Sequence, residues 1–591
     1  MITLAKNTAT RINACLEYTD GLPAQAMVER KLGATSVRTM PVEALDSPVL
    51  DGDVLVICRT GSASAAVVNR HFGVRAAGIR PSGYRIQEVK DGKRKAVIIL
   101  GGDLFGMLAG LADVLVWSER TSRGLVYRGG TRTENAAFPL RFFWTWDHST
   151  NWVLDDEGNQ VNGCANQYLK QPETYLEDYR RLIDHCLEAR FNGVIIWGFL
   201  RDAHGGERYA HDIARYAADR GVAILPGVGT TGYGGIYYEG EHPYNLETYL
   251  ARNPKRGNRW KDGQYSAREL SPYDPANQQW IAESLAWLYR SFPIGGVNLE
   301  NSDLMVDHSN AGKRGRAGIR SGEADYFKDQ FFAYKTALDI AHKVAPDAWN
   351  TYATYSGFGR GREVTNAGAD MGCEPYFARR MPPSAMAQWT LTGMLSETPV
   401  KLRDWMTKSR PSALYRNPRW PKGLMPPTPR SAGFIHQASQ WNGTLRRSAL
   451  AVSTFAEGCL RSHEAGLEGI SIHGEVTNRT LAWKLNYLAM RHWTYHPVST
   501  LEAFADSELS PRVGGARDAQ DFADALCKLE EGKDRRIEAG KRASEAVRSF
   551  YPYNGPARGD LAVTRQWAEL QEWAHIPEHS KSPVQGFADI L

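Results

Sequence analysis

Two acids lie three positions apart at the end of a short apolar run in the middle of the chain. The run, Ile294-Gly-Gly-Val-Asn-Leu, leads directly into Glu300, and Asp303 follows. A strand buried in a parallel sheet is almost continuously hydrophobic, and α/β folds carry their chemistry at the carboxyl ends of such strands. A carboxyl group in that place can act as a general acid or base. The alternative is structural, with one acid capping the following loop and the other in solvent.

The segments around these acids alternate between strand-like and helix-like patterns from Pro139 onwards, which is typical of βα units around a parallel sheet. We predict strands at 141–147, 192–199, 222–227, 294–303, 349–354, 369–374, 431–437 and 467–475. Eight strands with helices between them predict a (β/α)8 barrel of the TIM type. An open doubly wound sheet is the second choice, but no Gly-x-Gly-x-x-Gly opens a helix here.

The barrel is one of three predicted regions, since 591 residues are too many for a single core. Residues 1–135 are predicted to form a small α/β domain, 136–498 the barrel, and 499–591 a helical C-terminal region. In the first region, the turn Gly101-Gly-Asp103 precedes an apolar helix. It lacks the Walker spacing, so Asp103 is expected to cap the helix rather than to hold a phosphate.

The amino-acid composition limits the kinds of partner and ligand that we expect for this chain. A net charge of +5 and the lack of a basic block give no indication of nucleic acid, and no apolar run is long enough for a membrane span. The seven cysteines are scattered without a Cys-x-x-Cys pair, so we expect neither a disulfide framework nor a zinc cluster, and no metal or cofactor. The first residues carry no signal-peptide pattern, so we expect a cytoplasmic protein, or a periplasmic or secreted one if a signal has been removed. Both a monomer and a homo-oligomer stay open.

In a barrel, the carboxyl ends of all strands converge on one face. The predicted strand ends supply aromatic, amide, carboxylate and imidazole side chains. The candidates for substrate binding are Trp146, Asp147, His148, Trp197, Arg201, Asn298, Asp303, Tyr352, His436, Trp441 and His473. A Gly- and Tyr-rich insertion at 229–272 adds Tyr233, Tyr237 and Tyr238. Aromatic faces stack on sugar rings, and amides and carboxylates bond hydroxyls, so the predicted ligand is a carbohydrate.

Hydrolysis of a glycoside requires two carboxyl groups, one of them protonated. Glu300 is the predicted acid, and Glu475 or Glu374 the second carboxylate. Glu475 has a structural alternative as the cap of the helix beginning near Arg479, and Glu374 precedes a proline and could shape a loop. Neither a His-Glu-x-x-His nor a Gly-x-Ser-x-Gly motif is present. Two rival classes stay open: a metal-assisted isomerase or lyase on sugar acids, and a barrel that binds carbohydrate without catalysis.

The order of modules resembles a known group. A strand, a Gly turn and an apolar helix (98–115) precede Arg141-Phe-Phe-Trp as the first barrel strand. This resembles the N-terminal domain and barrel of the β-N-acetylhexosaminidases and the microbial α-glucuronidases. The resemblance implies a general acid at the end of strand four, where Glu300 stands. Hexosaminidases carry an Asp-Glu pair there, and this chain has Leu299, so their acetamido-assisted mechanism is not implied. For a substrate carboxylate, as in the α-glucuronidases, Arg141, Arg201 and Arg479 are candidates.

Overall fold

The computed structural model describes residues 1–18, 21–48, 50–92, 94–147, 172–300, 306–319, 325–357, 380–390, 431–435, 452–464, 466–473, 481–513, 515–520 and 523. Within these ranges no helix combines the length and the hydropathy needed to cross a bilayer.

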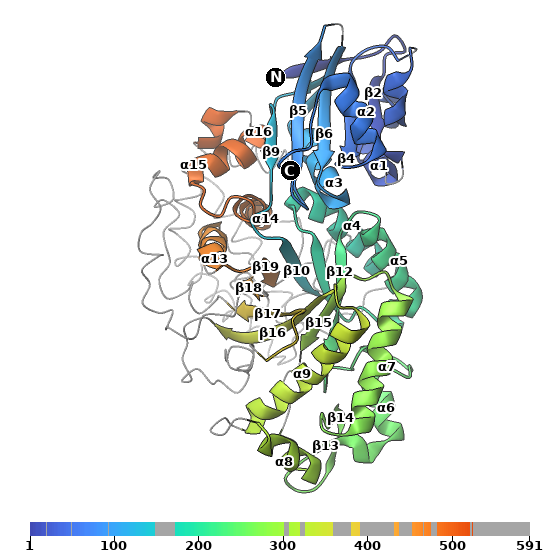
Figure 1. Cartoon of the computed structure of the whole chain (residues 1–591), viewed down its shortest axis with the longest axis vertical. Helices are drawn as coiled ribbons and strands as arrows, with labels where there is room; N and C mark the ends of the chain where they lie inside the picture. The colour runs from blue at the N-terminus through green and yellow to red at the C-terminus, as the bar shows by residue number, and fades with distance from the viewer. Residues whose placement is uncertain are drawn as a thin grey trace, which may run out of the picture.

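The N-terminal part of the chain is built on a six-stranded sheet in the order β3-β2-β4-β6-β5-β9 (Figure 1). The strands are β2 (Ile12–Leu16), β3 (Val37–Pro41), β4 (Val54–Arg59), β5 (Tyr84–Asp91), β6 (Arg94–Gly101) and β9 (Arg132–Glu134). The first four strands of this order are parallel, and β5 and β9 are antiparallel to their neighbours. A second, antiparallel sheet contains β1 (Ile2–Ala5), β7 (Ser118–Thr121) and β8 (Gly124–Tyr127). The predicted small α/β domain is therefore confirmed as a fold.

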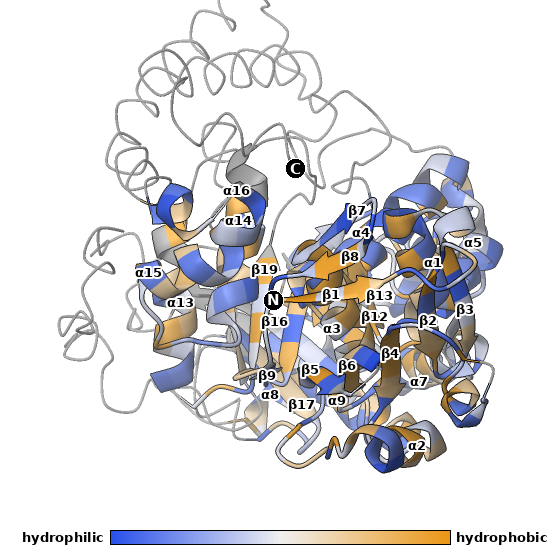
Figure 2. Cartoon of the chain, turned by 90° about the horizontal axis from the view of Figure 1, so that it is seen from above, coloured by the Kyte–Doolittle hydropathy of each residue, from blue (hydrophilic) through white to orange (hydrophobic). Residues whose placement is uncertain are grey.

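Alternation along β4 explains why helices cover both faces of this sheet. Successive side chains of a strand point to opposite faces, and the first four residues of β4 are all hydrophobic. Val54 and Val56 pack in one buried cluster with α2 (Ala63–Phe72). Leu55 and Ile57 belong to the other, with α1 (Gly21–Leu32) and α3 (Leu104–Val116). Figure 2 shows the hydrophobic character of β1, β4 and β8.

Helix α3 begins as predicted. The Oδ1 atom of Asp103 accepts a hydrogen bond from the backbone N–H of Gly106 at 2.7 Å, which makes Asp103 the N-cap. Oδ2 of the same carboxylate accepts from the N–H of Ser82 at 2.8 Å. Both oxygens are thus used within the domain, as expected for a capped turn between strand and helix.

From Leu140 the chain forms a closed barrel of eight parallel strands in sequence order. They are β10 (Leu140–Trp146), β11 (Gly193–Trp197), β12 (Ala223–Gly229), β15 (Gly296–Glu300), β16 (Trp349–Gly357), β17 (Ala385–Thr390), β18 (Ser431–Ile435) and β19 (Gly469–His473). The helices around them include α4 (Pro172–Ala189), α5 (Gly206–Ala218), α7 (Pro275–Ser291), α9 (Asp325–Val344), α13 (Val452–Glu464) and α14 (Leu481–Trp493), as Figure 1 shows. The predicted (β/α)8 barrel is confirmed.

The predicted position of one barrel strand is wrong. The sixth barrel strand is β17 at 385–390, whereas the prediction put it at 369–374, which lies outside the described residues. The true strand pairs with β16 on one side and β18 on the other. Its sequence, Ala-Met-Ala-Gln-Trp-Thr, is interrupted by Gln388, so it lacks the apolar run used to recognise the other strands. Glu374 therefore loses the position at a strand end on which its candidacy depended.

The described part of the C-terminal region, up to Val513, consists of three short helical turns. They are α15 (Leu501–Phe504), the π-helical turn η12 (Ala505–Leu509) and α16 (Ser510–Val513). Phe504 stacks on Trp493 of α14, with ring centroids 4.9 Å apart. These turns thus pack on the last barrel helix.

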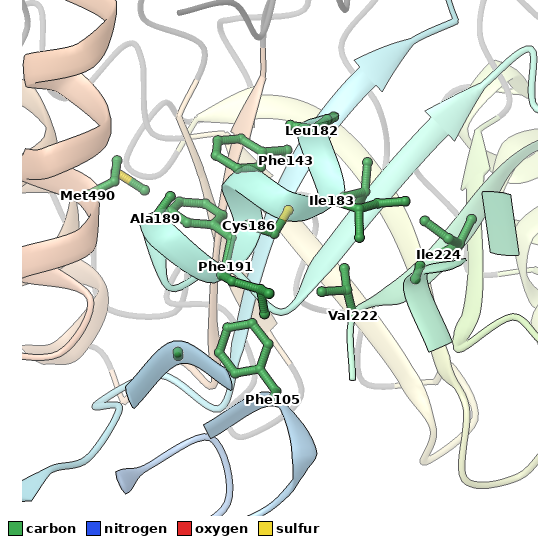
Figure 3. Close-up of a cluster of buried hydrophobic side chains, with 14 of the residues drawn as sticks. Phe105, Phe143, Leu182, Ile183, Cys186, Ala189, Phe191, Val222, Ile224 and Met490 are labelled. Carbon is green, nitrogen blue, oxygen red and sulfur yellow. The ribbon is translucent and has the colours of Figure 1, made fainter. Parts of the chain in front are cut away.

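The N-terminal domain shares a core with the barrel. Figure 3 shows Phe105 of α3 below Phe191 and the side chains of α4. Arg141 reinforces this junction, since its guanidinium lies over the rings of Phe105 and Tyr495 at 5.6 and 5.3 Å. Its Nε donates to the carbonyl of Arg190 at 2.6 Å. Arg141 stands at the amino end of β10, so the suggestion that it binds a substrate carboxylate was wrong.

Because α14 contains a buried histidine, we predict that the folded protein loses stability in mild acid. His492 has both ring nitrogens within hydrogen-bond distance of serine hydroxyls, Ser499 at 2.8 Å and Ser507 at 3.0 Å. Burial first, and then the nearby His496, Arg190 and Arg491, hold its pKa well below 6.5. The unfolded chain takes up a proton below about pH 6.5 that the folded chain does not, so the free energy of unfolding should fall there by up to about 1.4 kcal/mol per pH unit.

The test is urea unfolding between pH 7.5 and 5 for the wild type and His492→Gln. The variant should show a flatter profile, because glutamine does not titrate. Parallel profiles for the two proteins would contradict this assignment.

Candidate active site

Glu300 is the last residue of β15, at the carboxyl end of the fourth barrel strand, and its side chain is 1 % exposed. Asn298, two residues earlier, points into the barrel, so the strand period of two directs Glu300 inward as well, one layer nearer the mouth. Glu300 pairs with Gly229 of β12, and its carbonyl accepts from the N–H of Thr230 at 3.1 Å. The predicted acid therefore lies at the mouth of a closed barrel.

Asn298 is the centre of a hydrogen-bond network inside the barrel. Its Oδ1 accepts from the indole N–H groups of Trp144 (3.1 Å) and Trp197 (2.9 Å). Its Nδ2 donates to Thr351 Oγ1 (2.8 Å) and Gln388 Oε1 (2.6 Å). An amide has two acceptor sites and two donors, and all four are used. Asn298, a candidate for substrate binding, thus fixes the positions of the inward side chains directly below the mouth of the barrel.

Four aromatic rings line the mouth beside Glu300. Trp146 of β10 and Trp197 of β11 have ring centroids 5.5 Å apart. Tyr233 lies 5.7 Å from Trp197, and Tyr238 lies 5.7 Å from Trp146. The tryptophans are buried and the tyrosines half-buried, so the tyrosines face the solvent side. We call these four residues the aromatic box.

Tyr233 has an unusual backbone. Its φ is +49°, in the left-handed region that is costly for a residue with a Cβ. Gly234 and Gly235 follow with φ of +71° and +80°. A Cβ on Gly229 would lie 3.0 Å from the Cβ of Tyr233, so this ring starts next to the strand residue that pairs with Glu300. The strained turn therefore holds the start of the Tyr233 side chain beside Gly229, the strand partner of Glu300.

The packing of the aromatic box requires a glycine at position 227. A Cβ on Gly227 would lie 2.3 Å from the Trp197 ring, inside van der Waals contact. Gly227→Ala should therefore displace the indole from Asn298 and cost about 1–3 kcal/mol of unfolding free energy. Gly232→Ala is the matched control, since its nearest neighbour would be 3.8 Å away. Urea unfolding followed by tryptophan fluorescence measures both, and equal stability of the two variants would contradict the packing argument.

Asp147, next to the box, is 1 % exposed and lies against the side chains of an arginine and a histidine. Its Oδ2 lies 2.9 Å from Arg201 Nε and 3.2 Å from His204 Nδ1. Arg201 Nη1 in turn lies 2.6 Å from Glu239 Oε2, and His204 stacks on Tyr175 at 4.5 Å. This chain ties the loops after β10, β11 and β12 together. The guanidinium of Arg201 already faces two carboxylates, so a substrate carboxylate would have to compete with both.

The structure removes Tyr352 from the site. Its neighbour Thr351 points into the barrel, so Tyr352 points outward, toward the helices. There its ring lies 5.5 Å from that of Tyr334 in α9, and the residue is 1 % exposed. The prediction for Tyr352 was therefore wrong, because it used the position of the strand end and not the phase of alternation.

The structure thus brings together Glu300, Asn298, Trp146, Trp197, Asp147 and Arg201 of the predicted set. For His473, at the end of β19, only the backbone is described, and it pairs with Trp144. The remaining candidates lie outside the described residues: His148, Asp303, Glu374, His436, Trp441 and Glu475.

Of the other residues in this region, Tyr233 and Tyr238 were named as candidates from the sequence, but no role was assigned to His204 or Glu239. The signal for the tyrosines was the stretch Gly229-Thr-Thr-Gly-Tyr-Gly-Gly, because glycines supply the positive φ values of a tight turn. Nothing in the sequence joins Glu239 to Arg201. In the described part of the chain, no group of three or more His, Cys, Asp or Glu residues is placed to hold a metal ion.

Fold and site define a (β/α)8-barrel protein with an inward glutamate at the end of strand four. No family model and no curated protein sequence matches the chain. Among solved structures it is similar to a β-N-acetylhexosaminidase from Bacteroides fragilis, with 14 % identity and a TM-score of 0.49 over 83 % of this chain and 88 % of that one. An exo β-N-acetylglucosaminidase from Vibrio harveyi gives 9 % identity and a TM-score of 0.48 over 90 % and 76 %.

A GH138 enzyme targeting pectin rhamnogalacturonan II gives 11 % identity and a TM-score of 0.49. The match covers 90 % of this chain but only 56 % of that protein. At these identities the likeness is one of fold.

Proposed function

We propose that the chain is a glycoside hydrolase and that Glu300 is its general acid. The observation that carries the proposal is a glutamate, 1 % exposed, directed into the mouth of a closed barrel beside the aromatic box. Withdrawal of a carboxyl group from water favours its protonated form, which a general acid requires. Aromatic rings at the same mouth offer stacking surfaces for a sugar ring.

In the proposed reaction, a sugar ring stacks on Tyr233 and Tyr238, above the buried tryptophans. Glu300 donates its proton to the oxygen of the bond that is cleaved. A second carboxylate attacks the sugar or activates a water molecule. Glu475 is the better candidate for this role, since it follows the last barrel strand, and Glu374 has lost its place at strand six. Asp147 is held by Arg201 and His204, so we assign it to positioning and to substrate hydroxyls.

The proposed substrates are oligosaccharides or glycosides, with an acidic or N-acetylated sugar as the finer possibilities. A panel of chromogenic glycosides and uronides, assayed with the wild type and with Glu300→Gln, tests the class. Hydrolysis of at least one substrate by the wild type alone is the expected result. Activity lost with EDTA and restored by a divalent metal would favour the metal-assisted alternative instead. Binding without any turnover would favour a non-catalytic barrel.

A further inference from the structure

Two segments at the carboxyl side of the barrel form one surface, far from the N-terminal domain (Figure 1). The first is the hairpin of β13 (Gly257–Arg259) and β14 (Tyr265–Leu270), inserted after β12. The second consists of residues 306–309 and of α8 (Asn310–Ala317), which they precede. The N–H of His308 donates to the carbonyl of Arg259 at 2.7 Å, which joins the second segment to the hairpin. We call this surface the hairpin rim.

Buried hydrogen bonds hold the rim in place. Asp307 is fully buried and accepts from the hydroxyls of Ser271 at 2.5 Å and Ser309 at 2.9 Å. Its N–H donates to Asp329 of α9 at 2.8 Å, and Arg316 of α8 pairs with the same Asp329 at 2.8 Å. The hairpin and α8 are therefore fixed to the barrel helix α9. A fixed surface can bind a ligand without a large ordering cost.

The rim exposes aromatic rings where most of the molecule buries them. Trp260 is 39 % exposed and Tyr265 42 %, and among the described aromatic residues only Tyr18, in the N-terminal domain, is similarly exposed. The pairing of Arg259 with Tyr265 puts Trp260 on the opposite face of the hairpin. The Arg259 guanidinium lies 5.8 Å from the Tyr265 ring. The hairpin thus carries one exposed ring on each face.

Three exposed cations lie on the same two segments. Lys261 lies at the hairpin tip, and Lys313 and Arg314 lie on α8. None of the three has an ion pair with another described residue, whereas Arg268 nearby faces Glu247 at 3.6 Å. Asp262 is the one exposed acid between Trp260 and Tyr265. A surface that carries both exposed rings and cations without ion-pair partners among the described residues is suited to a ligand that has sugar rings and negative charge.

We propose that the hairpin rim binds an acidic polysaccharide at a distance from the reacting bond, with Trp260 and Tyr265 contacting sugar rings and Lys261, Lys313 and Arg314 facing its carboxylates. The N–H of Leu270 donates to the carbonyl of Thr231, next to the aromatic box, at 2.9 Å. Five residue steps along β14 lead from Leu270 to Tyr265, a span of roughly 17 Å. A chain of several sugars can therefore reach from the mouth to the rim. This inference rests on the proposed glycosidase function and specifies its substrate class.

The test uses the full-length Glu300→Gln protein, which holds a substrate without cleaving it. Affinity is measured for polygalacturonate and for neutral dextran at 20 and 200 mM salt. Lys313→Glu/Arg314→Glu should weaken polygalacturonate binding at least tenfold and reduce its salt dependence. Trp260→Ala/Tyr265→Ala should weaken it as well. The matched controls, Lys343→Glu at the end of α9 and Tyr18→Ala, should leave it unchanged.

Equal affinity for dextran, or unchanged binding in both rim variants, would overturn the proposal. So would a single-stranded DNA oligonucleotide that binds as tightly as polygalacturonate, because the rim would then be a general polyanion or nucleic-acid site. Hydrolysis of small glycosides by the wild type, with rim variants that bind normally, would refute the rim alone. Rim-dependent binding without any hydrolysis would refute the glycosidase proposal and leave the rim.

Discussion

Glu300→Gln should lower kcat for a natural oligosaccharide by about 10²–10⁴-fold, the usual contribution of a general acid. Glutamine has nearly the same shape but carries no transferable proton. The loss should be much smaller for an aryl glycoside with a strongly acidic phenol, because such a leaving group departs without protonation. The measurement is kcat on both substrate types, with the melting temperature of each protein. A fold that is unchanged while the two substrates respond differently identifies an acid and not a structural carboxylate.

The pH dependence of kcat/KM provides a second test of the Glu300→Gln variant. The limb of kcat/KM that falls at high pH reports loss of the acid's proton, so it should disappear in Glu300→Gln. Glu283→Gln, on the exposed face of α7, is the matched control and should behave as the wild type. Near-normal turnover of the natural substrate by Glu300→Gln would remove Glu300 from the role of acid.

The barrel was predictable because most of its strands are apolar runs that end in polar residues. β15 is an example: it is buried along its whole length and ends in Glu300. β17 was missed because a buried strand with Gln388 inside it resembles a loop in sequence. The glutamine can be buried because distant groups pair with its amide: Asn298, 90 residues earlier, donates to its oxygen, and the Ser471 hydroxyl accepts from its nitrogen. Such a partner cannot be found from local patterns.

The candidate site was predictable only as a set of strand ends. Which way a residue points depends on the phase of each strand, and one register step separates the inward Thr351 from Tyr352 against α9. The role of Asn298 depends on indoles from two other strands. The partners of Asp147, Arg201 and His204, come from the loop after another strand, so a carboxylate that looked available in sequence is in fact engaged.

Asp113→Ala should be the most destabilising of the substitutions considered. Asp113, on α3, is 1 % exposed and pairs with Arg132 (2.9 Å), Arg190 (3.0 Å) and Arg491. The hydroxyl of Tyr84 donates to the same carboxylate. Arg190 and Arg491 belong to the barrel, so this one carboxylate compensates buried cations on both sides of the junction. Removal of Asp113 leaves the three arginines with Glu134 and Glu508 as their remaining carboxylate partners, fewer than the cations buried there, which costs about 3–5 kcal/mol.

The pKa of Asp113 also indicates that this carboxylate stabilises the folded protein. Burial alone would raise its pKa, but Arg491, Arg190 and Arg132 hold it well below 3.8. A carboxyl group whose folded pKa is depressed contributes stability above about pH 3.8, and this contribution is lost as the pH falls toward the folded value. The difference in stability between wild type and Asp113→Ala should therefore be full at pH 7 and shrink below pH 4.

The measurement is urea unfolding at pH 7, followed in parallel by tryptophan fluorescence and by far-UV circular dichroism. Asp46→Ala is the matched control, because Asp46 also faces two basic side chains, Arg70 and His71, but at the exposed surface, where ion pairs contribute little. It should unfold as the wild type does. Since Asp113 joins the two parts of the chain, its loss should also separate the transitions of the two probes, as the N-terminal domain and barrel cease to unfold together. A single transition at the wild-type midpoint would show that the three arginines are compensated without Asp113, and that the hydrophobic core around Phe105 holds the junction by itself.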